Sequence, residues 1–328
     1  MRQLLGPVLV PIVGGLVFLV ALLGLIGTAI RDPHPHDLSV GLVGPAPAVQ
    51  QISSAFAGNA PGAFRFTTYS SEPEARAAID SRDIDAALLF GQSSSRLIVA
   101  GAAGDGVTGV ITAAFTNVFQ SQGSTLNVEV VHPFSNGDAH GLVLFFVVVA
   151  VIISAVVVQA LIFTTTDDVG FSTRLLVVLG YAVLTGPIAM GAAEWIAGDY
   201  GSGIWAAIGL LMLGAAAVGA VVAGLVRLLG RAGLALAALI VVLLDLVSSG
   251  GPVGSQLLPD LYRWLAPWMA AGPLYSGLRG ALYFNGAGTG QPILILAEWF
   301  VAGIVLMAVG ELVFYLMHRG SLPPETVP

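Results

Sequence analysis

The sequence predicts an α-helical polytopic membrane protein with six transmembrane helices and an extracytoplasmic α/β domain between the first and the second helix. Hydrophobic residues make up 56% of its 328 residues and charged residues only 9%, whereas a soluble globular domain carries about 25% charged residues. Six apolar stretches are long enough to cross a bilayer. Between the first two lies one long polar segment, 31–140, in which strand-like and helix-like patterns alternate.

The apolar stretches define the predicted spans, because a helix needs about 20 mostly apolar residues to cross the hydrocarbon core. The first stretch is longer than the roughly 7–15 residues of a secretory signal core, so we interpret residues 1–30 as an uncleaved signal anchor. The other five stretches form a transmembrane domain over 141–328. The predicted spans are 8–30, 141–163, 175–197, 203–226, 233–249 and 293–317.

The positions of the arginines predict the orientation, because positive charge concentrates on the cytoplasmic side of short loops. With the N-terminus inside, more arginines are cytoplasmic than external, and six spans return the C-terminus to the cytoplasm. We therefore expect a multi-pass protein of the bacterial plasma membrane with residues 31–140 outside the cytoplasm. The inner arginines are Arg2, Arg174, Arg227, Arg231 and Arg319, and the outer ones are Arg31, Arg263 and Arg279.

The polar segment has the pattern of a small α/β domain. Ser71 precedes a predicted helix as its cap, and Pro73 suits the first turn of that helix. Alternating strands and helices over about one hundred residues are typical of one compact domain. The predicted strands are 38–43, 64–69, 86–90, 96–100 and 126–131, and the predicted helices are 47–57, 72–80 and 107–120.

The stretch 250–292, before the last span, is rich in glycine, proline and aromatic residues. Its segments 257–265 and 273–283 are amphipathic and helical in character. Trp264 and Tyr275 belong to a set of aromatic residues that suits the headgroup level of a membrane. We therefore predict short interfacial or re-entrant helices on the outer face.

The composition excludes several kinds of chemistry. All 12 basic residues are arginine and there is no cysteine, so the chain has no P-loop lysine, thiol nucleophile or thiolate metal site. The motifs G-x-S-x-G and H-E-x-x-H are absent too, so we expect no enzyme activity and no cofactor in this chain. A net charge of -7 argues against nucleic acid as a partner.

Three short passages match the order and spacing of residues in one known family. The first runs from Ser249-Gly250-Gly251-Pro252 through Leu258-Pro259, Pro267 and Pro273-Leu274-Tyr275 to Gly277-Leu278-Arg279. The second covers 71–88 in the polar segment, and the third, 138–142, leads into the second span. These passages, together with the order of one span, an outer α/β domain and five further spans, resemble the ABC-2 type transporter permeases, a family that includes the related phage-infection-protein-like (Pip-like) membrane proteins. The first passage, the most specific, is similar to the outer loop before the last span of these permeases.

The resemblance implies a dimeric permease subunit, in a homo- or heterodimer, that pairs with separate cytoplasmic ATPases. Such a subunit moves a lipid-like, drug-like or polymeric substrate outward, and ATP acts through the partner. The cytoplasmic segments are short, and their predicted ATPase contact consists of Asp167, Asp168 and Phe171.

Two alternatives to the exporter stay open. One is a Pip-like scaffold, receptor or secretion accessory protein that works without an ATPase and binds an envelope or secretion partner through its outer domain. The other is an ion-coupled transporter that uses Glu311.

Four acidic residues lie within the predicted spans, where ionisable groups are costly and often functional. We predict that Glu194, Asp245 and Glu298 line a polar pathway near the outer face and that Glu311 is buried more deeply. The alternative places the outer three at the headgroup boundary, hydrated or paired with Arg263 or Arg279. No basic residue of its own helix is close enough to Glu311 to pair with it directly.

Two further patterns have a functional and a purely structural interpretation. Small residues recur on the fourth span at Ala215, Gly219 and Ala223, a spacing that serves either a dimer interface or packing within one chain. Four histidines flank the outer domain, and they could bind zinc if its two connections to the membrane meet in space. Their spacing matches no ligand motif, so the alternative is a hydrated stalk. These histidines are His34, His36, His132 and His140.

Overall fold

The computed structural model describes residues 2–31, 33–91, 94–166 and 169–318. The chain divides into two compact units. The first unit contains Met1–Phe134, Asp138–Leu142 and Leu243–Gly272, and the second contains Ser135–Gly137, Val143–Val242 and Pro273–Pro328. The α/β segment therefore belongs to the same unit as the first span and the loop that follows the fifth.

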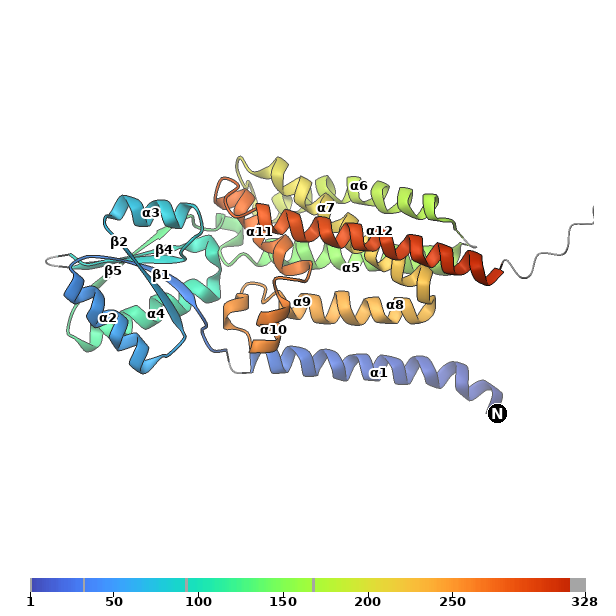
Figure 1. Cartoon of the computed structure of the whole chain (residues 1–328), viewed down its shortest axis with the longest axis horizontal. Coiled ribbons are helices and arrows are strands. Elements are labelled where there is room, and N and C mark those ends of the chain that lie inside the picture. The colour runs from blue at the N-terminus through green and yellow to red at the C-terminus, as the bar shows by residue number, and fades with distance from the viewer. Residues whose placement is uncertain (1, 32, 92–93, 167–168, 319–328) are drawn as a thin grey trace, which may run out of the picture. The chain divides into compact units, whose positions relative to one another are not determined.

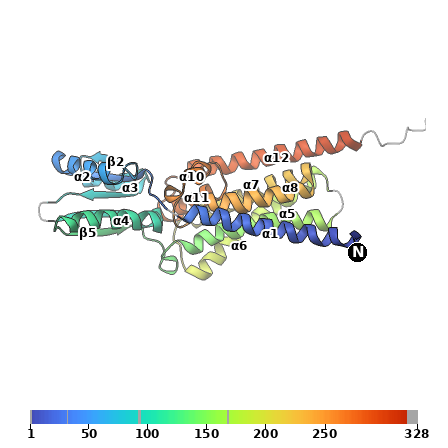
Figure 2. The same cartoon turned by 90° about the horizontal axis from the view of Figure 1, so that it is seen from below.

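The six predicted spans are present as six long apolar helical segments, which can be followed in Figures 1 and 2. The chain is thus a mostly helical, multi-pass membrane protein. The boundaries differ from the predicted ones by a few residues, because helices extend past the apolar run into polar flanks. The segments are α1 (Arg2–Ile30), α5 (Leu142–Thr165), α6 (Phe171–Ala197), α7 (Ile204–Leu229), the run Arg231–Ser248, and α12 (Gly290–His318).

The sequence predicts one helical span over 233–249, but in the structure the fifth span is not one regular α-helix. It consists of α8 (Arg231–Ala237), the π-helical segment η3 (Ala238–Leu244) and the short α9 (Asp245–Ser248). A π-helix closes its turns one residue later than an α-helix, and such segments are frequent at functional sites. The hydropathy pattern predicts only that this stretch is apolar, so it does not reveal the wider turns.

The polar segment forms a five-stranded sheet with the strand order β2-β1-β3-β4-β5. The central strand β1 pairs in parallel with both β2 and β3, whereas β4 runs antiparallel to β3 and parallel to β5. All five predicted strands are present, and their bounds differ from the predicted ones by at most one residue. They are β1 (Leu38–Val43), β2 (Phe64–Tyr69), β3 (Ala86–Leu89), β4 (Ser95–Ala100) and β5 (Leu126–Val131).

Helices cover both faces of this sheet. Figure 1 shows α2 (Ala46–Asn59) and α4 (Asp105–Ser121) on one face and α3 (Glu72–Asp80) on the other. The core on the α2 and α4 side is aromatic, with the rings of Phe56 and Phe115 centred 4.8 Å apart. Burial of these large apolar side chains is the main stabilisation of the sheet.

The first turn of α3 forms as the sequence predicted. The Ser71 hydroxyl accepts a hydrogen bond from the Glu74 backbone N–H, and Pro73 lies in the first turn. Serine satisfies a backbone donor that the helix leaves open, and proline has no N–H to lose there. The sequence therefore determined where this helix begins.

Two short helices follow the fifth span, as predicted, but the first is shorter than expected. A single 3-10 turn, η4 (Ser255–Leu257), comes before α10 (Asp260–Leu265), and α11 follows (Ala271–Tyr283). Pro259 is the N-cap of α10, and Leu258 before it has an extended backbone, because proline disfavours a helical conformation of the preceding residue; this delays the helix. Two further 3-10 turns in the chain are η1 (Gly101–Ala103) and η2 (Asn136–Asp138).

In the second unit, small residues on α7 allow its neighbours to approach closely. Ala223 is buried in one cluster with Val178 of α6 and Met307 of α12, and a Cβ on Gly219 would lie 3.6 Å from Val178. Ala215 is buried as well. The predicted small-residue stripe therefore packs inside the unit, which favours the intramolecular interpretation over a dimer interface.

One close approach between helices of this unit involves Gly303 of α12. A Cβ there would lie 2.4 Å from the carbonyl carbon of Ala220. We predict that Gly303→Ala lowers the stability by about 1–3 kcal/mol through overpacking. Thermal unfolding of the detergent-solubilised chain measures this loss. Gly209→Ala in α7 is the matched control, because nothing lies within 4 Å of its added Cβ, and equal losses in both variants would contradict the prediction.

Candidate functional site

The site with the most unusual chemistry lies around Asp245, the first residue of α9. Asp245 is fully buried, and its Oδ1 accepts a hydrogen bond of 2.7 Å from the backbone N–H of Ala271. Ala271 begins α11. A carboxylate oxygen at a helix N-terminus satisfies an open backbone donor and interacts favourably with the helix dipole. Asp245 thus fastens the end of the fifth span to the start of α11.

The second oxygen of Asp245 has no such partner. Oδ2 is buried and makes no hydrogen bond in the described part of the chain. The hydroxyls of the nearby Ser248 and Ser249 donate to carbonyl oxygens of their own helical turn instead. A buried polar atom without a partner costs about 1–3 kcal/mol. The surrounding structure therefore keeps the Asp245 side chain buried although its Oδ2 lacks a hydrogen bond.

We call residues 249–272 the junction loop. This segment includes α10 and the first two residues of α11, and it contacts the α/β domain through its backbone. The backbone N–H of Gly106 donates to the Pro252 carbonyl oxygen (3.1 Å). The backbone N–H of His36 donates to the Gln256 carbonyl oxygen (3.0 Å). A Cβ on Gly106 would lie 2.2 Å from the Val253 carbonyl oxygen. Only glycine permits this approach of α4 to the junction loop.

The junction loop also contacts the first span. The Tyr262 hydroxyl donates to the Leu25 carbonyl (3.0 Å) and lies 2.7 Å from the Thr28 hydroxyl. Ala29 and Leu258 are buried with Tyr262 in a small apolar cluster. Within the first unit, the junction loop therefore joins α1, α9 and the α/β domain.

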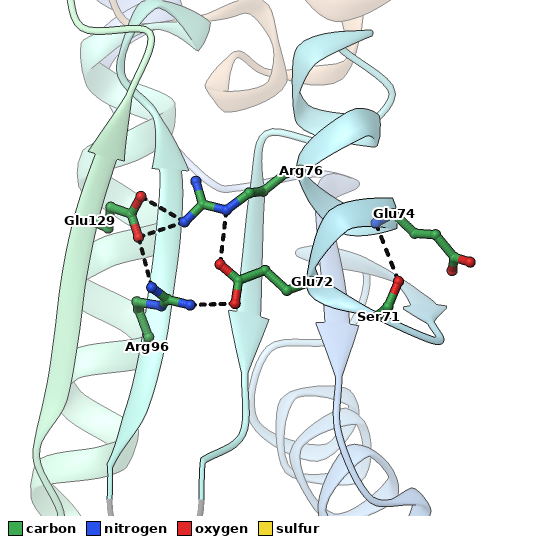
Figure 3. Close-up of polar contacts among 6 residues, drawn as sticks. All are labelled: Ser71, Glu72, Glu74, Arg76, Arg96 and Glu129. Carbon is green, nitrogen blue, oxygen red and sulfur yellow. Dashed lines mark hydrogen bonds and ion pairs between the residues drawn. The ribbon is translucent and has the colours of Figure 1, made fainter.

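The α/β domain carries a second polar cluster, shown in Figure 3. Arg76 on α3 bonds Glu72 of the same helix (2.9 Å) and Glu129 on β5 (2.7 Å), and Arg96 on β4 contacts both of these carboxylates. The hydrogen bond from Arg76 lowers the pKa of Glu72, and the two glutamates raise the pKa of Arg76. Because positive and negative charges alternate, we interpret the cluster as a fastening of α3 to the sheet and not as a ligand site.

The acidic residue Glu311 has a partner that the sequence interpretation missed. Its carboxylate lies 2.8 Å from Nε of Arg227 on α7, a side chain that is only 5% exposed. The Arg227 guanidinium also stacks over the Phe314 ring, 4.0 Å from its centre. Spacing along one helix reveals no basic partner for Glu311, and Arg227 lies at the predicted cytoplasmic end of another span, so the sequence does not predict this pairing across helices.

The acidic residues of the spans lie in different surroundings. Glu194 is half-buried near the end of α6, and Glu298 is exposed on α12. Glu298 and Glu311 are separated by about 20 Å along the same helix, at 1.5 Å per residue. The polar pathway stays a prediction, and Asp245 is the member of the set with an unsatisfied buried oxygen.

The histidines that flank the α/β domain, for which the sequence favours a hydrated stalk over a zinc site, contact different residues. His132 pairs with Asp80 (2.7 Å), His140 with Asp105 (3.2 Å) and His36 lies 3.9 Å from Asp260. Among the described residues, His34 included, no group of three or more histidine or acidic side chains could hold a metal ion. Each of the three paired histidines instead contacts a different aspartate, because the connections 31–37 and 132–140 attach to different elements.

The remaining predicted site residues are distributed over both units. In the junction loop, Ser249 is buried and Gly250 and Gly251 have positive φ angles. Arg279 of α11 stacks on the Tyr275 ring, 4.7 Å from its centre, and Pro273 lies in the first turn of that helix. Phe171 packs against the apolar cluster of α6, α7 and α12. Asp167 and Asp168 lie outside the described residues.

Comparison with known proteins gives no assignment. The sequence matches no protein-family model, and no curated protein or solved structure is significantly similar to the chain. The function must therefore be argued from the residues and their geometry.

The contribution of the ion pair between Arg227 and Glu311 to stability can be tested by substitution. We predict that Glu311→Gln lowers the stability by about 1–3 kcal/mol, because it leaves the buried Arg227 guanidinium without its charge partner. This is less than for a fully buried pair, since Glu311 itself is 38% exposed. Thermal unfolding measures the loss, with the exposed Glu298→Gln on the same helix as control. Equal shifts in both variants would contradict the assignment.

The charge cluster around Glu72 in the α/β domain can be tested by its dependence on pH. Because the folded chain lowers the pKa of Glu72, the ionised carboxylate stabilises the domain at neutral pH, and this contribution disappears as the pH falls through the lowered pKa. We predict that Glu72→Gln accelerates amide hydrogen exchange in β5 by up to about fivefold at neutral pH, since a half-exposed pair contributes at most about 1 kcal/mol. Under acidic conditions the difference vanishes. Asp83→Asn, outside the cluster, leaves exchange unchanged at both pH values.

Proposed function

We propose that the chain is the transmembrane permease subunit of an ABC-2 type exporter. The observation that carries this proposal is the order of the segments, one apolar span, an α/β sheet domain and five further spans, which is the order that the resemblance implies. The substrate class is lipid-like, drug-like or polymeric, and it moves outward. Two copies of the chain, or one copy and a similar subunit, form the transport unit.

The energy source in this proposal is a separate cytoplasmic ATPase. The chain has no lysine, so it cannot form a P-loop of its own, and it acts as a transport subunit and not as an enzyme. It needs no bound cofactor, and nucleic acid is not among its partners. In the orientation that the arginines favour, both termini are cytoplasmic and residues 31–140 face outward.

The junction loop supports a mechanical role for the outer domain. Backbone hydrogen bonds connect the loop to Gly106 and His36 of that domain, and Tyr262 connects it to α1. A rigid connection of this kind transmits movement between the sheet domain and the ends of two spans. An exporter needs such coupling where the substrate leaves the membrane.

The ion-coupled alternative finds less support at Glu311. Its carboxylate already forms an ion pair with Arg227, and a carrier carboxylate must exchange its ion or proton during each cycle.

The scaffold alternative is favoured by one feature, the edge strand β5. It has no neighbour on its outer side in the sheet, and Val128 and Val130 on it are 42% and 55% exposed. An unpaired strand edge with apolar side chains can accept a strand of a partner protein. A Pip-like receptor or secretion accessory protein could use this edge to bind an envelope component.

The exporter proposal predicts a stable complex with an ABC-type ATPase. We expect the tagged full-length chain to purify with an ATPase encoded beside its gene, as a complex with two permease subunits by native mass spectrometry. We also expect ATP hydrolysis that stops when the P-loop lysine of the partner is replaced. A monomer that purifies without an ATPase would overturn the proposal and favour the scaffold.

The predicted contact segment provides a variant of this test. The double variant Asp167→Ala, Asp168→Ala is expected to reduce the amount of copurified ATPase severalfold, because it removes the charged part of the cytoplasmic segment before α6. Asp199→Ala is the matched control, since this exposed aspartate lies in the loop at the opposite end of α6. Equal recovery of the ATPase with both variants would exclude this contact.

A further inference from the structure

Asp245 is a buried titratable group without a counter-charge. No basic side chain forms an ion pair with it in the described part of the chain, and its surface is fully excluded from solvent. An ionised carboxylate loses most of its hydration in such a place, and the backbone N–H groups of Ala270 and Ala271 do not replace it. The neutral acid avoids this cost while its Oδ1 keeps the hydrogen bond from Ala271.

The elements around Asp245 do not supply the missing charge. In the first unit α9 contacts α1 and α10, and the described side chains of α1 are uncharged. On α10, Asp260 and Arg263 pair with each other at 2.7 Å, and the Tyr262 hydroxyl is occupied at α1. The charged residue of α11 is Arg279. Its backbone lies about 12 Å from that of Ala271 along the helix axis, at 1.5 Å per residue.

We propose that Asp245 is a proton-binding site that latches the junction loop. With the proton bound, Asp245 is neutral, and the bond to Ala271 holds the start of α11 against the end of the fifth span. When the proton leaves, both oxygens carry negative charge, and Oδ2 requires water or a cation. Because Oδ2 is sealed, solvent reaches it only after the junction loop moves away from α9.

The consequences of this movement follow from the contacts of the loop. Residues 249–272 bond Gly106 and His36 of the sheet domain and Thr28 of α1, so release at Asp245 changes the attachment of all three. The π-helical turns of η3 directly precede Asp245, and they provide a segment whose hydrogen bonds can shift between i→i+4 and i→i+5. The site thus couples proton occupancy to the attachment of the outer domain, whether the chain is a permease or a scaffold.

Infrared difference spectroscopy of the full-length protein in nanodiscs tests the protonation state directly. The C=O stretch of a neutral carboxylic acid lies at a higher frequency than the bands of an ionised carboxylate, and the measurement needs no reagent to enter the sealed site. We expect a carboxylic-acid band at neutral pH that Asp245→Asn removes and Glu298→Gln leaves unchanged, and we expect this band to weaken as the pH rises. Absence of the band would overturn the proposal and leave a charged helix cap.

Hydrogen exchange tests the latch itself. In the wild-type chain, exchange of the junction-loop amides is expected to rise by about tenfold between neutral and alkaline pH, after correction for intrinsic exchange. Asp245→Asn keeps an oxygen for Ala271 but cannot ionise, so its corrected exchange stays flat. Glu298→Gln behaves as the wild type. Parallel pH responses of the wild type and Asp245→Asn would overturn the latch, and if Asp245→Asn does not fold, the pH dependence of the carboxylic-acid band of the wild type decides.

Discussion

The first unit depends on the close backbone approach between α4 and the junction loop. Gly106 permits it, because any side chain there would collide with the Val253 carbonyl. The hydrogen bond between Gly106 and Pro252 then fixes the sheet domain to a segment that continues from the fifth span. The remaining contacts of the loop, to His36 and to Tyr262 with α1, require this position. An α/β domain that could be a freely hanging module is thereby attached to membrane helices.

Charged and titratable side chains within the apolar helices lie in three different kinds of environment. Arg227 and Glu311 neutralise each other and add a contact with an aromatic ring. Glu298 stays exposed, and Asp245 is buried with one satisfied and one unsatisfied oxygen. Because a membrane raises the cost of unpaired charge, these three arrangements have different chemical capacities. A neutralised pair stabilises packing, whereas a buried acid without a counter-ion can bind and release a proton.

Much of the fold followed from local patterns. Apolar runs predicted the six spans, short strand-like segments predicted the five strands, and the Ser71 cap with Pro73 predicted the start of α3. Such features depend on neighbours in sequence, which is why they can be recognised without a structure. The candidate site was predicted only in part, because Asp245 and Glu311 were identified by residue type while their surroundings were not. The dispersed histidines show the same limit, since spacing along the chain does not reveal which aspartate each one meets.

By itself, the sequence determined that this protein belongs in a membrane, that a polar α/β segment follows its first span, and that lysine and cysteine chemistry is absent. Only the tertiary structure decided that Glu311 faces Arg227, that the small residues of α7 pack inside the chain, and that Asp245 meets the first N–H of α11. The reason is physical. Hydropathy and backbone preference act over a few residues, whereas the environment of a charge is set by side chains and backbone groups that are distant in sequence.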